Sequence, residues 1–224
     1  MRAYLAPLIF GTVGCAILLG LGIWQVQRLA WKQDLIARTE VLMNADPVPL
    51  PEAPSEEADE YRPVILDGTV LTGELHVITT RRGSGPGFRV IAPFETAQGR
   101  RILVERGYVR EAEKDADRPT GPIDSFGILS WPDERTFDTP ANDVAANYWF
   151  ARDVAEMGQV LGTEPVLVVN AGPDLPGAPE PMPIGAAYHN RHLEYAVTWF
   201  GLAIGWAFMT GLWIVARRRE LAEA

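Results

Sequence analysis

The sequence predicts an α+β membrane protein in which two transmembrane helices flank an extracytoplasmic antiparallel β-sheet, or partly closed barrel, that also contains a short helix. Three observations lead to this fold class. Residues 3–27 and residues 195–216 contain no charged side chain, and each run exceeds the roughly 20 residues that a helix needs to cross a bilayer. The long segment between them breaks into short β-type runs separated by glycine and proline, as in a β-rich domain.

The first apolar run predicts a transmembrane helix over residues 5–27. It ends at Gly22-Ile23-Trp24-Gln25 rather than at a small-residue cleavage site, which favours a retained anchor over a signal peptide. We expect the helix to continue as an extension over 28–44 and to end in a linker over 45–60, which is rich in proline and acidic residues. Small residues that would let a second helix approach closely are Gly11, Gly14, Ala16, Gly20 and Gly22.

Residues 61–170 are expected to form the β-rich domain. The turns at 72–73 and 97–100 fit hairpins that pair neighbouring strands, and the glycine-rich run 81–87 fits a β-turn better than a phosphate-binding loop. A short helix is expected from Asp153 as N-cap to Leu161, closed by Gly162. The candidate strands are 61–71, 74–81, 88–94, 101–109, 123–131, 147–151 and 166–170.

A second proline- and glycine-rich linker over 171–188 leads to a transmembrane helix over 193–216 and a tail over 217–224. Arg217, Arg218 and Arg219 follow this second span. By the positive-inside rule the tail is expected in the cytoplasm, and with two spans the N-terminus is expected there too. The β-rich domain would then lie outside the cytoplasmic membrane.

Charge and cysteine content exclude several classes of function. Residues 28–194 carry 16 Lys and Arg against 27 Asp and Glu, a net charge of −11, whereas nucleic-acid binding needs clustered cations. The single cysteine, Cys15, lies in the first apolar run, so we expect no disulfide, Cys-x-x-Cys copper site or zinc cluster. Without a nucleophile elbow, an H-E-x-x-H helix or a P-loop in the sequence, we do not expect an enzyme.

Five short motifs follow one another along nearly the whole chain. They are Leu21-Gly22-Ile23-Trp24-Gln25 with Arg28 and Trp31-Lys32; Tyr61-Arg62-Pro63-Val64 with Gly68; Gly87 to Pro93-Phe94; Ile102-Leu103-Val104-Glu105-Arg106-Gly107-Tyr108-Val109; and Asn190-Arg191-His192-Leu193-Glu194-Tyr195-Ala196 with Thr198-Trp199-Phe200. In this order they resemble the Surf1 family, which assists the assembly of haem-copper cytochrome c oxidase. Glu105 and Tyr108 depart from the family pattern, which usually has asparagine and tryptophan there.

The resemblance implies an assembly factor that binds haem a and helps its insertion into subunit I of the oxidase, with the β-rich domain on the periplasmic face of a bacterial inner membrane. No Arg- and Ser-rich transit peptide precedes the first span, which fits a bacterial member. The family's usual candidate for the iron ligand corresponds to His192. The expected partners are subunit I, membrane lipid and the enzymes of haem a biosynthesis, with no nucleic acid.

Helical spacing supports a haem site at the start of the second span. A haem needs apolar surfaces for its macrocycle, imidazole for its iron and cations for its propionates. Arg191 is adjacent to His192, and Trp24, Arg28 and Lys32 are expected at the same membrane level; the candidate cofactor-binding residues are therefore His192, Tyr195, Trp199, Arg28, Trp24 and Arg191. Counting by three and four residues, one stripe holds His192, Tyr195, Trp199, Leu202, Trp206, Met209 and Trp213.

Two alternatives stay open. The stripe could simply be the face that packs against the first span, in which case the protein would be a membrane-anchored scaffold for an oxidase intermediate that binds no haem. The second axial ligand is not identified by the sequence. His189 lies one turn from His192 and cannot ligate the opposite face of the same iron, so we interpret it as an interfacial polar residue. His76 is expected on a strand, in a structural role.

Overall fold

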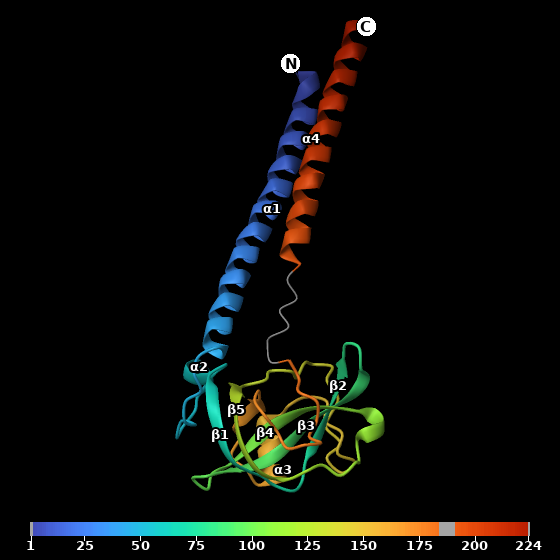
Figure 1. Cartoon of the computed structure of the whole chain (residues 1–224). Coiled ribbons are helices and arrows are strands. Elements are labelled where there is room, and N and C mark those ends of the chain that lie inside the picture. Colours follow the sequence, from blue (N-terminus) through green and yellow to red (C-terminus); the bar gives the residue numbers. More distant parts are fainter. Residues whose placement is uncertain (1, 184–190, 224) are drawn as a thin grey trace. The chain divides into compact units, whose positions relative to one another are not determined.

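The computed structural model describes residues 2–183 and 191–223 (Figure 1). The chain divides into two compact units. The first, called the helix pair, consists of residues 1–38 and 187–224, and the second, the β-domain, consists of residues 39–186.

The helix pair is built from α1, Arg2–Met43, and α4, His192–Glu223. Both are long and apolar enough to cross a membrane, over Leu5–Met43 and His192–Glu220, which suggests a membrane protein. Side chains without charge cover most of their length because no water is available in a bilayer to solvate a charged group. The helix α1 runs without a break through the predicted span and its predicted extension.

Glycines of α1 bring the two helices into direct contact. A Cβ atom added to Gly11 would overlap Thr210, one added to Gly14 would overlap the indole of Trp206, and one added to Gly22 would lie 2.7 Å from the ring of Phe200. The side chains of α4 therefore rest on the backbone of α1, as the small-residue pattern predicts. Gly20 is different, because nothing lies within 4 Å of its Cβ position.

The β-domain is a six-stranded mixed sheet that curls into a partial ring. The strand order is β1-β5-β6-β4-β3-β2, and β1 also pairs with β3. All pairings are antiparallel except that of β4 with β6, so the predicted fold class is confirmed with one parallel contact added. The strands are β1, Pro63–Val70; β2, Leu75–Arg81; β3, Gly85–Thr96; β4, Arg101–Arg110; β5, Gly121–Ser130; and β6, Leu167–Asn170.

Strand β3 explains why one predicted hairpin is wrong. Its 12 residues pair with β2 through Gly85 to Ile91 and with β1 through Phe94 to Thr96. The turn at 72–73 therefore joins two strands that both pair with β3 rather than with each other. The turns at 97–100 and 81–85 do close hairpins, as expected, with Gly83, Gly85 and Gly99 at positive φ.

The predicted strand over 147–151 is also wrong. This segment makes only isolated bridges, between Val77 and Trp149 and between Asp143 and Tyr148. Asn147 has a φ of 52°, which interrupts extended backbone. The apolar character of this segment has another cause: Trp149 is completely buried in a core cluster that includes Leu75 and Val77 of β2.

Short helices complete the β-domain. The helix α3, Val154–Leu161, buries Met157 in the core and ends at Gly162 in the left-handed region, as predicted. Asp153 occupies the N-cap position, but its carboxylate makes no capping bond and pairs instead with Arg135 and Asn142. The remaining helices are α2, Glu56–Asp59, and the 3-10 turn η1, Glu111–Glu113.

Candidate functional site

His192 is the first residue of α4, and its imidazole contacts α1. The ring is half-buried, and its Nδ1 lies 2.7 Å from the Oε1 atom of Gln25. An amide oxygen can only accept a hydrogen bond, so Nδ1 carries the proton in this contact. The remaining ring nitrogen, Nε2, then carries the lone pair, which is the form in which histidine ligates a metal.

Gln25 reaches His192 because it lies on the face of α1 that packs against α4. Gly11, Gly14, Gly22 and Gln25 recur at three, eight and three residues, which keeps them on one side of a helix with about 3.6 residues per turn. The side chain of Gln25 is only 8% exposed. Sequence reasoning missed this residue because it searched for charges and histidines. The signal available was one uncharged polar side chain in register with the glycines.

Two open flanks run along the helix pair, and one of them carries most of the predicted site. The rings of Phe10 and Trp213 lie 6.5 Å apart and mark this flank. Arg28 follows Phe10 by 18 residues, and Tyr195 precedes Trp213 by 18 residues; 18 residues make about five turns of helix. Arg28 and Tyr195 therefore project from the same flank as the Phe10 and Trp213 rings.

The same register sets the level of these residues. Gly22 lies against Phe200 and Gln25 against His192, so the antiparallel pairing continues to Arg28 beside the first turn of α4. The structure thus brings together an imidazole, an aromatic ring and a cation at one end of one flank. We call this end the His192 flank, defined by Trp24, Arg28, Arg191, His192 and Tyr195.

Cations of the His192 flank stack on its aromatic rings. The guanidinium carbon of Arg28 lies 5.9 Å from the ring centroid of Trp24 and 5.2 Å from that of Trp31. Arg191 lies 6.0 Å from the ring of Tyr195 and donates from Nε to Glu194 at 3.0 Å. Trp24 is 48% exposed and Tyr195 is 49% exposed, so apolar surface is available beside the half-buried imidazole.

The predicted stripe on α4 divides between two environments. Trp206 and Trp213 pack against Phe10 of α1, although Trp213 stays 47% exposed, and Trp199 is half-buried. Tyr195, Leu202 and Met209 remain exposed along the flank. Packing against α1 therefore accounts for Trp206 and Trp213, as the scaffold interpretation expects. It does not cover the exposed surface beside His192.

The other two histidines are His189 and His76. His189 lies outside the residues that the structure describes. His76 is 4% exposed on β2, where its Nε2 lies 2.8 Å from Glu74 and 3.0 Å from Arg118, and its Nδ1 lies 3.2 Å from Asn147. This environment holds three segments of the β-domain together, in agreement with a structural role.

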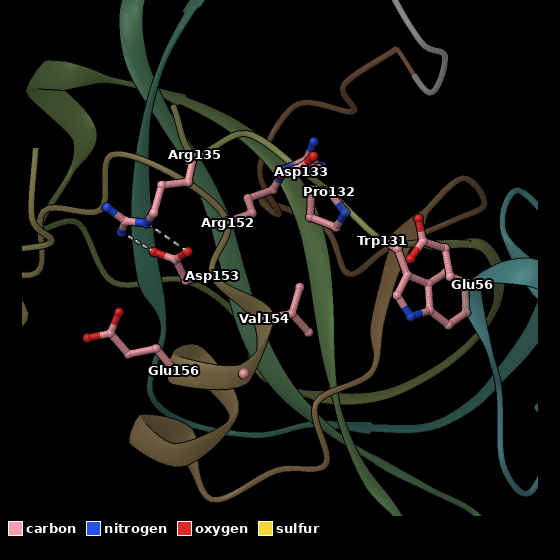
Figure 2. Close-up of a pocket in the computed structure, with 10 residues that line it drawn as sticks. Glu56, Trp131, Pro132, Asp133, Arg135, Arg152, Asp153, Val154 and Glu156 are labelled. Atoms are coloured by element: carbon pink, nitrogen blue, oxygen red, sulfur yellow. Dashed lines mark hydrogen bonds and ion pairs between the residues drawn. The ribbon is translucent and has the colours of Figure 1, made fainter. Parts of the chain in front are cut away.

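A cleft of about 780 Å³ lies in the β-domain, where the chain leaves β5 and enters α3 (Figure 2). Arg135 in its wall pairs with Asp153, and Arg152 pairs with Glu134 and Glu105. Both guanidinium groups in this cleft are therefore already paired with carboxylates. None of the residues of the His192 flank lines it.

The chemistry of the His192 flank fits a haem. It supplies one imidazole whose Nδ1 contacts the Gln25 amide, two exposed aromatic rings and two cations near the end of an apolar helix. Among the residues that the structure describes, no cluster of three or more His, Cys, Asp or Glu side chains could hold a bare metal ion.

Comparison with known proteins identifies what the chain is similar to. A family model described as the SURF1 family matches residues 13–204. Surfeit locus protein 1 of Xenopus tropicalis is 34% identical over 226 residues, covering 90% of this chain and 73% of the relative. The human protein of the same name is 33% identical over 85% of this chain and 71% of its own length. The SURF1-like protein of Rickettsia conorii is 30% identical over 92% of this chain and 89% of its own length.

Proposed function

Because the chain belongs to the SURF1 family, known as cytochrome oxidase assembly factors, we propose that it binds haem a and helps its insertion into subunit I of a haem-copper cytochrome c oxidase. One observation carries the haem part of this proposal. His192 presents an imidazole whose Nδ1 is committed to Gln25, beside exposed aromatic side chains on the same flank.

Each residue of the His192 flank has a distinct task in this proposal. His192 binds the iron through Nε2. Trp24 and Tyr195 cover apolar macrocycle surface, and Arg28 and Arg191 pair with the propionates near the membrane surface, where water remains available. Trp199, which is half-buried, supports the floor of the site. Haem a is the cargo of this protein rather than a resident cofactor.

We further propose that the protein resides in a bacterial inner membrane, with the β-domain in the periplasm and both termini in the cytoplasm. Arg217, Arg218 and Arg219 at the end of the second candidate span support this orientation. Reporter fusions check it: alkaline phosphatase inserted at residue 138 should be active and the same enzyme fused after residue 219 inactive. The reverse pattern would contradict the orientation.

The test of haem binding is visible absorption. The full chain, produced in a host that makes haem a and purified in detergent, should carry a Soret band, and the His192→Ala variant should lose most of it. The matched control is His189→Ala, which removes an imidazole three residues away and should keep the band. Retention in His192→Ala together with loss in His189→Ala would move the ligand to the other histidine.

A scaffold without haem is the second candidate, and the packing of Trp206 and Trp213 against Phe10 favours it, since these rings serve the helix contact. The two functions differ in one measurement. A scaffold variant lacking the His192 imidazole would still co-purify with subunit I and restore oxidase content. If the protein carries haem, the same variant would still co-purify with subunit I, but the oxidase formed in its presence would be deficient in haem a.

A further inference from the structure

We propose that Gln25 of α1 is a positioning residue that holds His192 in the iron-ligating tautomer and orients its ring; the proposal rests on the haem-binding function proposed above. Its carbonyl oxygen accepts the Nδ1 proton of His192 at 2.7 Å. The site would then be shared between helices: α4 supplies the ligand and α1 supplies the group that aims it.

Burial makes this hydrogen bond hard to replace. Gln25 is 8% exposed and belongs to the helix face that contacts α4. An amide removed from water without a hydrogen-bond partner destabilises a protein. In an apolar helix pair the carbonyl of Gln25 gains most by accepting the one nearby ring proton, so the contact favours a single tautomer of His192.

The tautomer matters because the two ring nitrogens have exclusive roles. A neutral imidazole has one protonated nitrogen and one with a lone pair, and only the latter can bind iron. With Nδ1–H donating to Gln25, Nε2 is the ligating atom. A hydrogen bond from the distal N–H also increases the basicity of the ligating nitrogen, and loss of such a partner typically weakens metal binding by about 10–100-fold.

Packing below Gln25 fixes the distance between its carbonyl and the imidazole. Gly22, three residues before Gln25, lies directly against the ring of Phe200, eight residues after His192. The close contact of that ring with the α1 backbone restricts rotation and sliding of the two helices. The position of Gln25 relative to His192 is therefore set by the helix contact, which makes the orientation of the imidazole independent of bound haem.

The first experiment uses haem-free protein. The full chain labelled with ¹⁵N-histidine, in detergent, contains three histidines, and the His192 signals are those missing from His192→Ala. We expect a protonated Nδ1 and an unprotonated Nε2 in the wild type at a pH above that of imidazole protonation. Gln25→Leu should shift the population toward the Nε2–H form. An Nε2–H tautomer in the wild type would overturn the proposal.

The second experiment titrates haem a and compares three variants. Gln25→Leu should bind about 10–100-fold more weakly. Gln25→Glu keeps an acceptor in place and should restore binding to within a few-fold of the wild type. The matched control is Gln27→Leu, the same exchange two residues away at an exposed position, and it should leave affinity and spectrum unchanged.

The two experiments separate the possible failures. A wild type that shows the expected tautomer but takes up no haem a would defeat the proposed function, and with it the need for a positioning residue. A wild type that binds haem a, with Gln25→Leu binding equally well and showing the same spectrum, would defeat the role of Gln25 alone. Equal losses in Gln25→Leu and Gln27→Leu would point to general damage of α1 and also overturn the assignment.

Discussion

Glu105 is a buried charge at a position where the sequence departs from the Surf1 pattern. Its side chain is 0% exposed and accepts hydrogen bonds from Arg89 and Arg152, the latter at 2.8 Å. Arg152 also pairs with Glu134. The two arginines and the two carboxylates compensate each other, which a buried carboxylate requires. A departure that looks mild in sequence is thus the centre of a charge network in the structure.

We predict that Glu105→Asn, which introduces the family's usual residue, destabilises the β-domain by about 3–5 kcal/mol. The variant leaves Arg89 without its carboxylate and Arg152 with Glu134 alone, and a buried charge without full compensation is costly. The measurement is the unfolding of the full chain in detergent, followed by near-UV circular dichroism. The control is Glu95→Gln, which breaks a surface pair with Arg101 and should cost at most about 1 kcal/mol. Equal stability of the two variants would refute this account.

At the level of secondary-structure elements, sequence periodicity predicted most of the fold. Apolar runs without charge found α1 and α4, and alternation with glycine turns found the six strands and α3. Periodicity failed where a contact distant in the sequence decides which strands pair. Strand β3 pairs with both β1 and β2, so these two strands do not form a hairpin with each other. Trp149 makes only an isolated bridge, with Val77. Neither fact is encoded in the local pattern of apolar residues.

The candidate site shows the same division. Helical spacing placed Tyr195, Trp199 and His192 on one broad stripe, but it could not tell which members face α1. Only the contacts of Trp206 with Gly14 and of His192 with Gln25 decide this. Gln25 remained unassigned because one neutral amide in an apolar helix has no distinctive spacing, and its partner lies 167 positions away.

The contact between α1 and α4 should depend on which glycine is replaced. We predict that Gly11→Leu separates the helices, because its side chain would overlap Thr210, whereas Gly20→Leu is tolerated, because nothing lies within 4 Å of that position. The reporter is the ¹⁵N signal of His192, which should lose its single-tautomer character in Gly11→Leu and keep it in Gly20→Leu. If both variants keep the wild-type signal, the helices are not held by the glycine contacts.

On the scale of the whole molecule, ion pairs between distant segments hold the β-domain together. A hydrogen bond from Arg100 lowers the pKa of the Glu164 carboxyl, and one from Arg135 lowers that of Asp153. Burial raises the pKa of Glu134, but the hydrogen bonds and charge of Arg152 outweigh burial and leave that pKa below its ordinary value. Burial also raises the pKa of Glu74, but hydrogen bonds from His76 and Arg118 outweigh burial and leave that pKa below its ordinary value.

These four carboxyls predict that the β-domain loses stability in acid. A carboxyl whose pKa is lower in the folded state contributes its full stabilisation above its unfolded pKa, about 4–4.5, and loses it as the pH falls through the folded value. Glu60, with its pKa raised by burial, acts in the opposite direction, but it is one group against four. The measurement is the unfolding temperature of the full chain in detergent, followed by near-UV circular dichroism. These groups should not affect it between about pH 5 and 8, a window that follows from the reference pKa values. Below about pH 5 the unfolding temperature should fall steadily, by about 2–4 °C for each kcal/mol of stability lost. An unfolding temperature that stays constant down to about pH 3 would show that these ion pairs contribute no net stability, since the same carboxyls would then be protonated in the unfolded chain without consequence.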